Sequence, residues 1–260
     1  DFIVANPAAA VVMIVEASPT AGGVLTIKSS DTARLTTTNE ARAIVESITA
    51  IPSGAEDQVY VSVKRVIDGS TVRHIEFIKT IEFGDDVTNA FFVDSGLTYD
   101  STATSTITGL NHLEGEVVSI LADGATHPDR TVSAGAITLD RTASKVHVGY
   151  GYASTVETLR LEAGADDGIA QGKIKRIHGV TARFFNTVGA ELGPDTDNLD
   201  RLPFRDSSMF MDEAVPLFTG DKEIYFPSGY ETDARVVVRQ SQPLPMTVLA
   251  IMRRSNTFDA

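Results

Sequence analysis

Short stretches of the chain alternate apolar and polar residues with a period of two, which is typical of half-buried β-strands. The clearest case is residues 59–64, where three valines alternate with Tyr60, Ser62 and Lys64. Asp68-Gly69-Ser70 then supplies turn-forming residues, and the apolar pattern resumes over residues 72–77. This arrangement predicts a β-hairpin.

The same reasoning predicts strands along most of the chain. One run is ambiguous: Ala41, Ile44, Val45 and Ile48 fit helical spacing behind Thr38 as a candidate N-cap, but the Ile, Val and Thr content favours a strand. Pro243 and Pro245 cannot donate to a central ladder and therefore predict a loop or an edge. The remaining predicted strands are residues 117–121, which end at Asp123-Gly124, and residues 136–139, 146–150, 180–185, 235–238 and 246–251.

These strands predict an all-β chain of two or three small units, built as sandwiches, barrels or propeller-like blades, with little helix. Linker-like composition occurs at residues 101–108, 163–172 and 193–200. We therefore divide the chain into a first β unit over residues 1–92 that belongs to a larger β domain, a small barrel-like module over residues 93–152, and a last β unit over residues 153–260. Because the chain lacks an initial Met and opens on strand-like residues, we expect it to be a piece of a longer protein.

The bulk composition narrows the classes of function. The formal net charge is −13, which disfavours a protein that grips DNA through Lys and Arg but suits a conduit through which DNA must slide. The chain has no Cys, so disulfides, thiolate metal sites and Cys nucleophiles are excluded, and assembly in a reducing cytoplasm is consistent with this. No apolar run approaches the roughly 18 residues that a membrane-spanning helix needs, so we expect no membrane partner.

The sequence offers no motif that predicts catalysis or a bound cofactor. It has neither a nucleophile elbow, nor a phosphate-binding glycine loop, nor a zinc-binding pair among its five His residues. For His112 we expect a hydrogen bond that fixes a turn. The paired carboxylates Asp85-Asp86 and Asp166-Asp167 are interpreted as solvated loop residues.

One acidic loop imitates a calcium site. Residues 195–200 (DTDNLD), with Asp195, Asp197 and Asp200, imitate the start of an EF-hand loop. An EF-hand needs Gly at the sixth place and Glu at the twelfth, whereas this chain has Asp200 and Asp206 there. We therefore predict no EF-hand and keep these three aspartates as a weak candidate for calcium of another kind.

Several segments, in a fixed order over roughly residues 45–252, resemble a family of phage and prophage tail proteins, the tail tubular protein B-like or nozzle proteins of short-tailed phages. Gly115 and Gly124 within them suit turns that need positive φ. The segments are Val61-Ser62-Val63-Lys64-Arg65, Arg73-His74-Ile75-Glu76-Phe77, Phe91-Phe92-Val93-Asp94-Ser95-Gly96-Leu97-Thr98-Tyr99, residues 109–118 (GLNHLEGEVV), Leu121-Ala122-Asp123-Gly124, Val148-Gly149-Tyr150-Gly151-Tyr152, Phe218-Thr219-Gly220-Asp221, Pro243-Leu244-Pro245 and residues 247–251 (TVLAI).

The resemblance implies a virion structural protein that assembles in the bacterial cytoplasm into a ring of identical copies in the tail. The ring would contact other tail proteins and passing DNA, retain the DNA, and conduct it at ejection. The resemblance implies no active site. We expect apolar edges near Phe91, Phe92, Phe184 and Phe185 to form interfaces between copies.

Two alternatives stay open. A host-recognition module of a tail fibre or adhesin predicts an exposed cleft with clustered polar and aromatic groups. A hydrolase of glycan or cell wall predicts two facing carboxylates roughly 5–9 Å apart in a groove.

Overall fold

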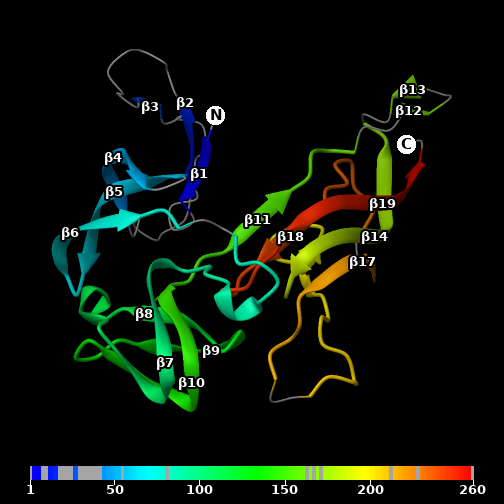
Figure 1. The fold of residues 1–260 in the computed structure, drawn as a ribbon. Coiled ribbons are helices and arrows are strands. Elements are labelled where there is room, and N and C mark those ends of the chain that lie inside the picture. Colours follow the sequence, from blue (N-terminus) through cyan, green and yellow to red (C-terminus); the bar gives the residue numbers. More distant parts are fainter. Residues whose placement is uncertain are drawn as a thin grey trace. The chain divides into compact units, whose positions relative to one another are not determined.

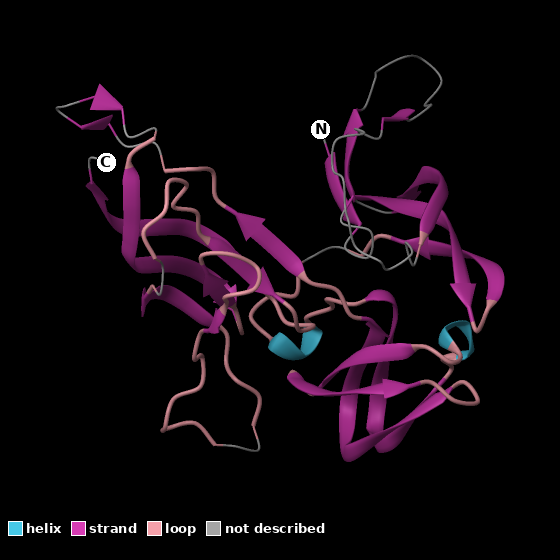
Figure 2. Cartoon of the chain, turned by 180° about the vertical axis from the view of Figure 1, so that it is seen from behind, coloured by secondary structure: helices cyan, strands magenta, loops and turns pink. Residues whose placement is uncertain are grey.

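The structure, a computed structural model, describes residues 43–53, 56–79, 82–161, 164–165, 168–169, 172–210, 213–226 and 229–258, and it also places three strands near the N-terminus. The protein is all-β, as predicted: antiparallel sheets are joined by loops (Figure 1). In the described part, helix is limited to the 3-10 turns η1 (Val87–Asn89) and η2 (Asn111–Leu113) (Figure 2). The N-terminal strands β1 (Phe2–Asn6), β2 (Val11–Glu16) and β3 (Thr26–Lys28) form one sheet in chain order.

The chain forms two compact units. The first unit contains residues 1–82, 93–120 and 127–152, and the second contains residues 83–92, 121–126 and 153–260. The second unit therefore takes two short segments from the first half of the chain. The division into three parts at residues 92 and 152 stays a prediction.

In the first unit, β4 (Ile44–Ser53), β5 (Glu56–Ile67) and β6 (Ser70–Phe77) form a three-stranded sheet with β5 in the centre. The predicted hairpin is confirmed, and the ambiguous stretch from residue 44 onward is a strand. Asp68 and Gly69 have φ of 45° and 71°, which gives the two-residue turn the backbone twist that flanking strands require. Residues 38 and 41 of the alternative helical reading lie outside the described residues.

A four-stranded sheet completes the described part of the first unit. Its order is β7 (Asp94–Thr108), β10 (Ala136–Tyr150), β8 (Val117–Ala122) and β9 (Ala125–Thr131). The two strands predicted at residues 136–139 and 146–150 are one strand, whose pairing shifts between Thr138 and Ala143. The linker predicted at residues 101–108 is wrong: this stretch is part of β7, because its β-branched threonines suit a strand as well as a loop.

The second unit contains two larger sheets and a small hairpin. The first sheet has the order β17 (Phe218–Tyr225), β14 (Ile174–Thr187) and β19 (Val248–Phe258). The second has the order β11 (Ser154–Glu157), β18 (Val237–Gln240), β15 (Glu191–Gly193) and β16 (Asp200–Arg201). The hairpin of β12 (Gly164–Ala165) and β13 (Gly168–Ile169) lies in the predicted linker at 163–172, part of which is outside the described residues.

The core of the second unit lies between the strands of these sheets. Strand alternation places Val180, Ala182 and Phe184 of β14 inside, and the predicted strand at residues 180–185 is thereby confirmed. Pro243 and Pro245 lie in the loop before β19, as predicted. In the part of the chain described by the structure, no helix has the length and apolar character to cross a bilayer. The fully buried members of the core are Ile177, Val180, Ala182, Phe184, Leu192, Ala234, Val236 and Val238.

Candidate functional site

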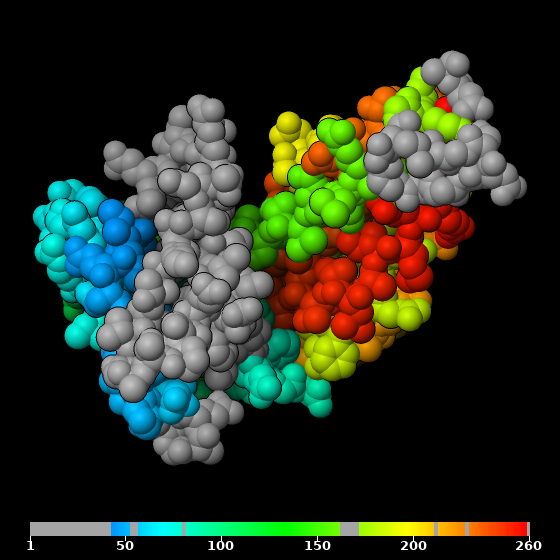
Figure 3. Space-filling view, turned by 90° about the horizontal axis from the view of Figure 1, so that it is seen from above, coloured from blue at the N-terminus to red at the C-terminus, as the bar shows by residue number. Residues whose placement is uncertain are grey.

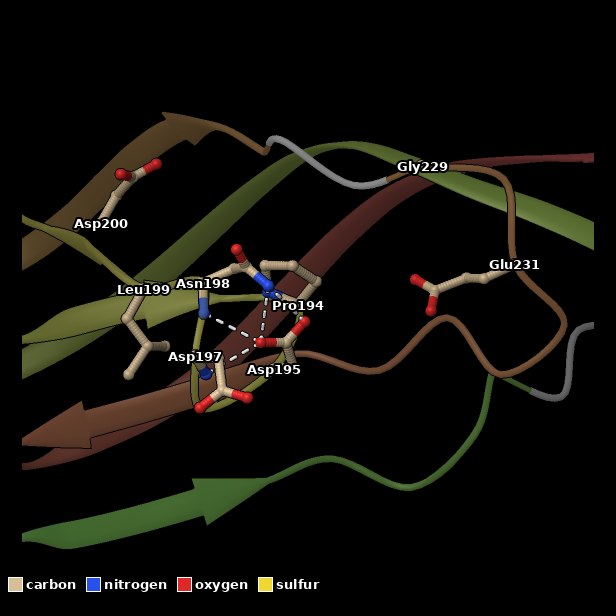
Figure 4. A pocket seen from close by; sticks show the side chains of 8 residues that line it. All are labelled: Pro194, Asp195, Asp197, Asn198, Leu199, Asp200, Gly229 and Glu231. Atoms are coloured by element: carbon tan, nitrogen blue, oxygen red, sulfur yellow. Dashed lines mark hydrogen bonds between the residues drawn. The ribbon is translucent and has the colours of Figure 1, made fainter.

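An acidic pocket lies in the second unit. It has a volume of about 660 Å³ and lies between the loop that joins β15 to β16 and the segment that precedes β18. Asp195 and Asp197 come from the loop, Asp200 begins β16, and Glu231 comes from the segment (Figure 4). The fold therefore brings the three candidate calcium ligands to one pocket and adds a fourth carboxylate to them.

The loop is held by the side chain of Asp195. Its Oδ1 accepts hydrogen bonds from the backbone N–H groups of Asp197 (2.9 Å) and Asn198 (2.8 Å), and the Asn198 amide donates to both carboxylate oxygens at 2.9 Å. These bonds, led by that from the Asn198 side chain, lower the pKa of Asp195 below its ordinary value. Asp195 therefore acts first as the acceptor that closes a tight turn.

Gly193 fixes the path of the same loop. A Cβ atom at this position would lie 1.8 Å from the carbonyl oxygen of Asn198 and 3.0 Å from the Cα of Leu199. Only a residue without a side chain lets the returning backbone come this close to β15. The wall of the pocket thus depends on a glycine at the end of a strand.

Glu231 reaches the pocket from a backbone that is tied to β14. Lys175 and Glu231 exchange two backbone hydrogen bonds, of 2.7 and 2.9 Å. The buried Lys175 ammonium donates to the Thr232 carbonyl at 2.8 Å. This segment is therefore fixed both by its backbone and by a buried cation.

The carboxylate of Glu231 lies in an unfavourable environment. Its Oε1 is buried and accepts no hydrogen bond in the structure. Burial, with smaller contributions from the negative charges of Asp233 and Asp195, raises the pKa of Glu231. The pocket therefore holds two carboxyl groups with opposite pKa shifts: the pKa of Glu231 is raised and that of Asp195 is lowered.

Opposite pKa shifts in neighbouring carboxyls are a pattern found in acid–base catalysis. Here the pattern has a structural cause, because three groups donate hydrogen bonds to Asp195 and hold it in its own turn. The lining residues are Pro194, Asp195, Asp197, Asn198, Leu199, Asp200, Gly229 and Glu231, without an aromatic ring on which a sugar could stack. Within the described ranges, no group of three or more His, Cys, Asp or Glu side chains is placed to hold a metal ion. The geometry therefore gives the calcium candidate no support.

The predicted interface residues separate into buried and exposed positions. Phe184 is fully buried in the core of the second unit, so its assignment to a surface edge is wrong. Adjacent strand residues point to opposite faces, and Phe185 is accordingly 48% exposed. Phe91 is half-buried, and Phe92 packs edge-to-face on Phe83 with ring centroids 5.8 Å apart.

The other residues considered for chemistry have structural contacts. The Nε2 of His112 lies 2.9 Å from the Ser95 carbonyl, which is the expected turn-fixing hydrogen bond. Asp86 accepts from the Thr88 N–H at 2.9 Å and caps η1. Asp85 accepts from the Asn186 amide at 3.2 Å. Asp166 and Asp167 lie outside the described residues.

Sequence reasoning missed two features of the second unit. Glu231 lies more than thirty positions from the acidic loop, and nothing in its local pattern places it there. The second feature is an apolar groove of about 350 Å³ along the start of β19. The alternation of residues 246–251 predicts a strand, but it does not predict which side of that strand is exposed.

Neither a family model nor a curated protein matches this chain.

Proposed function

We propose that the protein is a structural component of a phage tail, in which copies form a ring that retains DNA and conducts it at ejection. The proposal rests on the ordered segments that resemble the tail tubular protein B-like family and on how they meet in space. In this role the protein works mechanically, and its residues serve folding and assembly.

The observation that carries the proposal is a buried ion network in the first unit. Arg65 donates to Glu76 at 2.9 and 2.8 Å and to Asp94 at 3.2 Å, and its side chain is 1% exposed. These three residues belong to three successive family-like segments. The segments therefore meet in one folded centre, which supports reading them together as one family signature.

A further family-like stretch, residues 109–124, supplies buried apolar side chains. It makes the turn η2 and strand β8, and Gly115 and Gly124 both have φ of 75°. Conformations of this kind favour glycine. Leu110, Leu113, Val118, Ile120 and Leu121 are buried.

The sheets have edges that an assembly can use. β4 and β6 are the outer strands of one three-stranded sheet, and β17 and β19 are the outer strands of another. Unpaired strand edges readily accept a strand of a neighbouring copy. The net charge of −13 weakens adhesion to DNA, which suits a passage through which DNA must slide.

The test is to label intact phage particles with antibody raised against this chain and to locate the label by electron microscopy. Particles that were produced without this chain serve as the control. We expect label at the tail, with a copy number per particle that matches a ring. Particles that carry no label contradict the proposal.

A host-recognition module is the second candidate: the acidic pocket supplies the polar groups that this candidate predicts, but no aromatic ring. The carboxylates of this pocket can accept hydrogen bonds from sugar hydroxyls. Label at fibre tips, together with glycan binding that Asp197→Asn abolishes, would support this candidate. A hydrolase would instead release sugars from purified cell wall and lose that activity in Glu231→Gln.

A further inference from the structure

We propose that two copies of this chain associate through the outer edge of β6, which pairs antiparallel with β6 of the second copy. The two strands are centred on Ile75, so that the sheets of β4, β5 and β6 join into one sheet across both copies. The inference concerns association alone and does not depend on the proposed function.

β6 presents apolar side chains to solvent at the edge of its sheet. Ile75 is 82% exposed, and Phe77, two residues further on, is 55% exposed on the same face of the strand. Atoms of the β5–β6 hairpin, cyan in the space-filling view, lie at the surface of the molecule (Figure 3). Pairing with a second strand would remove this apolar surface from water.

The edge of β6 is regular. Its eight residues pair with β5 in one register, from Ser70 opposite Ile67 to Phe77 opposite Tyr60. Outer strands of natural proteins commonly resist pairing with another chain by means of a bulge or a proline. The outer strands β4, β7, β9, β17 and β19 each have a shift in their pairing or a proline. β6 has neither, so its edge can accept another strand.

The direction of the backbone groups on this edge follows from one hydrogen bond. Ile78 donates its N–H to the Val59 carbonyl at 2.9 Å, and so its backbone groups face β5. Successive residues of a paired strand direct their N–H and C=O groups alternately to the two sides. Arg73, Ile75 and Phe77 therefore direct these groups away from β5, where a second strand can pair with them.

The side chains of β6 are complementary to themselves in one register. With Ile75 opposite Ile75 of the second copy, Arg73 lies opposite Phe77 and His74 lies opposite Glu76. The first pair is apolar, the second places a guanidinium beside an aromatic ring, and the third places an imidazole beside a carboxylate. All three kinds of cross-strand pair are favourable.

The adjacent registers lack this complementarity. Centring the pair on Glu76 would place two Glu76 carboxylates opposite each other and Arg73 opposite Lys79. Centring it on His74 would place two imidazoles opposite each other and Ile75 opposite Arg73. Like charges directly opposite each other destabilise a sheet, so the charges of β6 favour the register centred on Ile75.

His74 gives a further reason for this register. Its Nε2 is buried and has no hydrogen-bond partner among the described residues, and its ring lies edge-on to that of His112 with centroids 6.1 Å apart. The dimer brings the Glu76 carboxylate of the second copy beside this ring. Glu76 accepts two hydrogen bonds from Arg65 and one from Ser95, and a carboxylate has about four acceptor sites, so it can accept one more.

The contact uses the same surface on both copies. It therefore closes on two copies and does not by itself generate a ring or a filament. A larger assembly would need a second contact elsewhere on the chain.

Sedimentation equilibrium of the full chain measures the association. We expect a monomer–dimer equilibrium, and Ile75→Pro should raise the dissociation constant about tenfold or more, because proline lacks the N–H that faces the second copy. Ile75→Lys should have the same effect, since it places two ammonium groups opposite each other, and it serves if proline disturbs the strand. Val66→Lys is the matched control: Val66 is 56% exposed on the central strand β5, and its replacement should leave the dissociation constant unchanged.

Spin labels test the register. The chain has no Cys, so Thr71→Cys and Lys79→Cys, each four residues from Ile75, give one labelling site apiece. In the dimer the two labels at residue 71 should be about 26 Å apart, twice four residues at about 3.3 Å each, and the two labels at residue 79 should be equally far apart. Double electron–electron resonance measures both distances. A register centred on His74 or Glu76 would make them differ by about 13 Å.

Four results would overturn the proposal. A wild-type chain that stays monomeric would leave this edge to a strand of another protein. An Ile75→Pro or Ile75→Lys chain that associates like the wild type, or unequal label distances, would exclude this pairing. A Val66→Lys chain that also dissociates would assign the contact to the face of the sheet. Loss of the virion label would leave the dimer standing, and a monomeric chain would leave the label standing.

Discussion

Arg65 and Glu76 form a two-point ion pair inside the first unit, with Nε–Oε1 and Nη2–Oε2 distances of 2.9 and 2.8 Å. The pair joins neighbouring strands, and Asp94 extends it to β7. Ser95 donates to the same Glu76 at 3.1 Å, and the guanidinium lies 5.6 Å from the ring centre of Tyr150. A buried cation is thus surrounded by groups from the sheet of β4, β5 and β6 and from the sheet that contains β7 and β10.

Replacing Arg65 with Met should strongly destabilise the first unit. The change keeps an apolar stem but leaves the Glu76 and Asp94 carboxylates, 19% and 21% exposed, without their cation. Removing one partner of a buried pair costs about 3–5 kcal/mol. Urea denaturation followed by circular dichroism measures the loss in the free energy of unfolding.

Arg73→Met is the matched control. Arg73 forms a similar two-point pair with Glu46, but its side chain is 61% exposed. Water and salt screen an exposed pair, so this loss should be much smaller than the loss in Arg65→Met. If the two substitutions cost the same, the Arg65 network is not the centre of this unit.

Tyr152 should resist ionisation in the folded protein. Burial, with a smaller contribution from the charge of Asp94, raises the pKa of Tyr152 from 10.0 to about 12. A raised pKa means that the folded state holds the proton more tightly. The corresponding stability, about 2–3 kcal/mol, is therefore present below pH 10 and lost as pH rises toward 12.

Tyrosinate absorbance, measured against pH for the wild type and Tyr152→Phe, checks this. The difference between the two absorbance curves should rise near pH 12. Over this pH range the free energy of unfolding should fall less in the variant than in the wild type. Tyr225→Phe, at an exposed position, is the control. A difference curve centred near pH 10 would contradict the burial of this hydroxyl.

The sequence predicts the strands well because their cause is local. In β5 the alternation of apolar residues with a period of two continues up to Asp68-Gly69. The positive φ angles of this turn give the backbone twist that the flanking strands require. The same pattern does not say which face is buried. Phe184 and Phe185 are chemically equal neighbours, and only the packing of β14 buries the first and exposes the second.

The candidate site is less predictable because it depends on distant pairs. The aspartate spacing at residues 195–200 finds the loop, but the role of Asp195 follows from the turn that it closes. Glu231 joins this loop only through the pairing of its segment with Lys175 on β14. Such long-range pairings leave no periodic signal at either position.

Glu231→Gln should stabilise the protein at neutral pH. The raised pKa means that the stability associated with the protonated carboxyl is complete below about pH 4.5 and is lost as pH rises through the folded-state pKa. A neutral amide avoids this loss. The melting temperature of the variant should exceed that of the wild type near pH 7 and equal it at acid pH.

Asp197→Asn is the control for Glu231→Gln, since it removes a carboxylate from the same pocket on its exposed loop. It should not reproduce the pH-dependent gain. An equal gain in both variants would mean that general repulsion in the pocket, rather than the burial of Glu231, sets the effect.

Gly193→Ala should displace the wall of the acidic pocket. The new Cβ would meet the carbonyl oxygen and carbon of Asn198 at 1.8 and 2.8 Å, and backbone atoms can yield only if the whole loop moves. Overpacking of this kind costs about 1–3 kcal/mol.

Gly229→Ala is the matched control, because it lies on the same pocket and a Cβ there meets nothing within 4 Å. Urea denaturation and the NMR shifts of the Asp197 and Asn198 amides, which donate to Asp195, measure the two effects. If Gly193→Ala matches Gly229→Ala in both, the loop does not approach β15 in solution and the pocket does not have this wall.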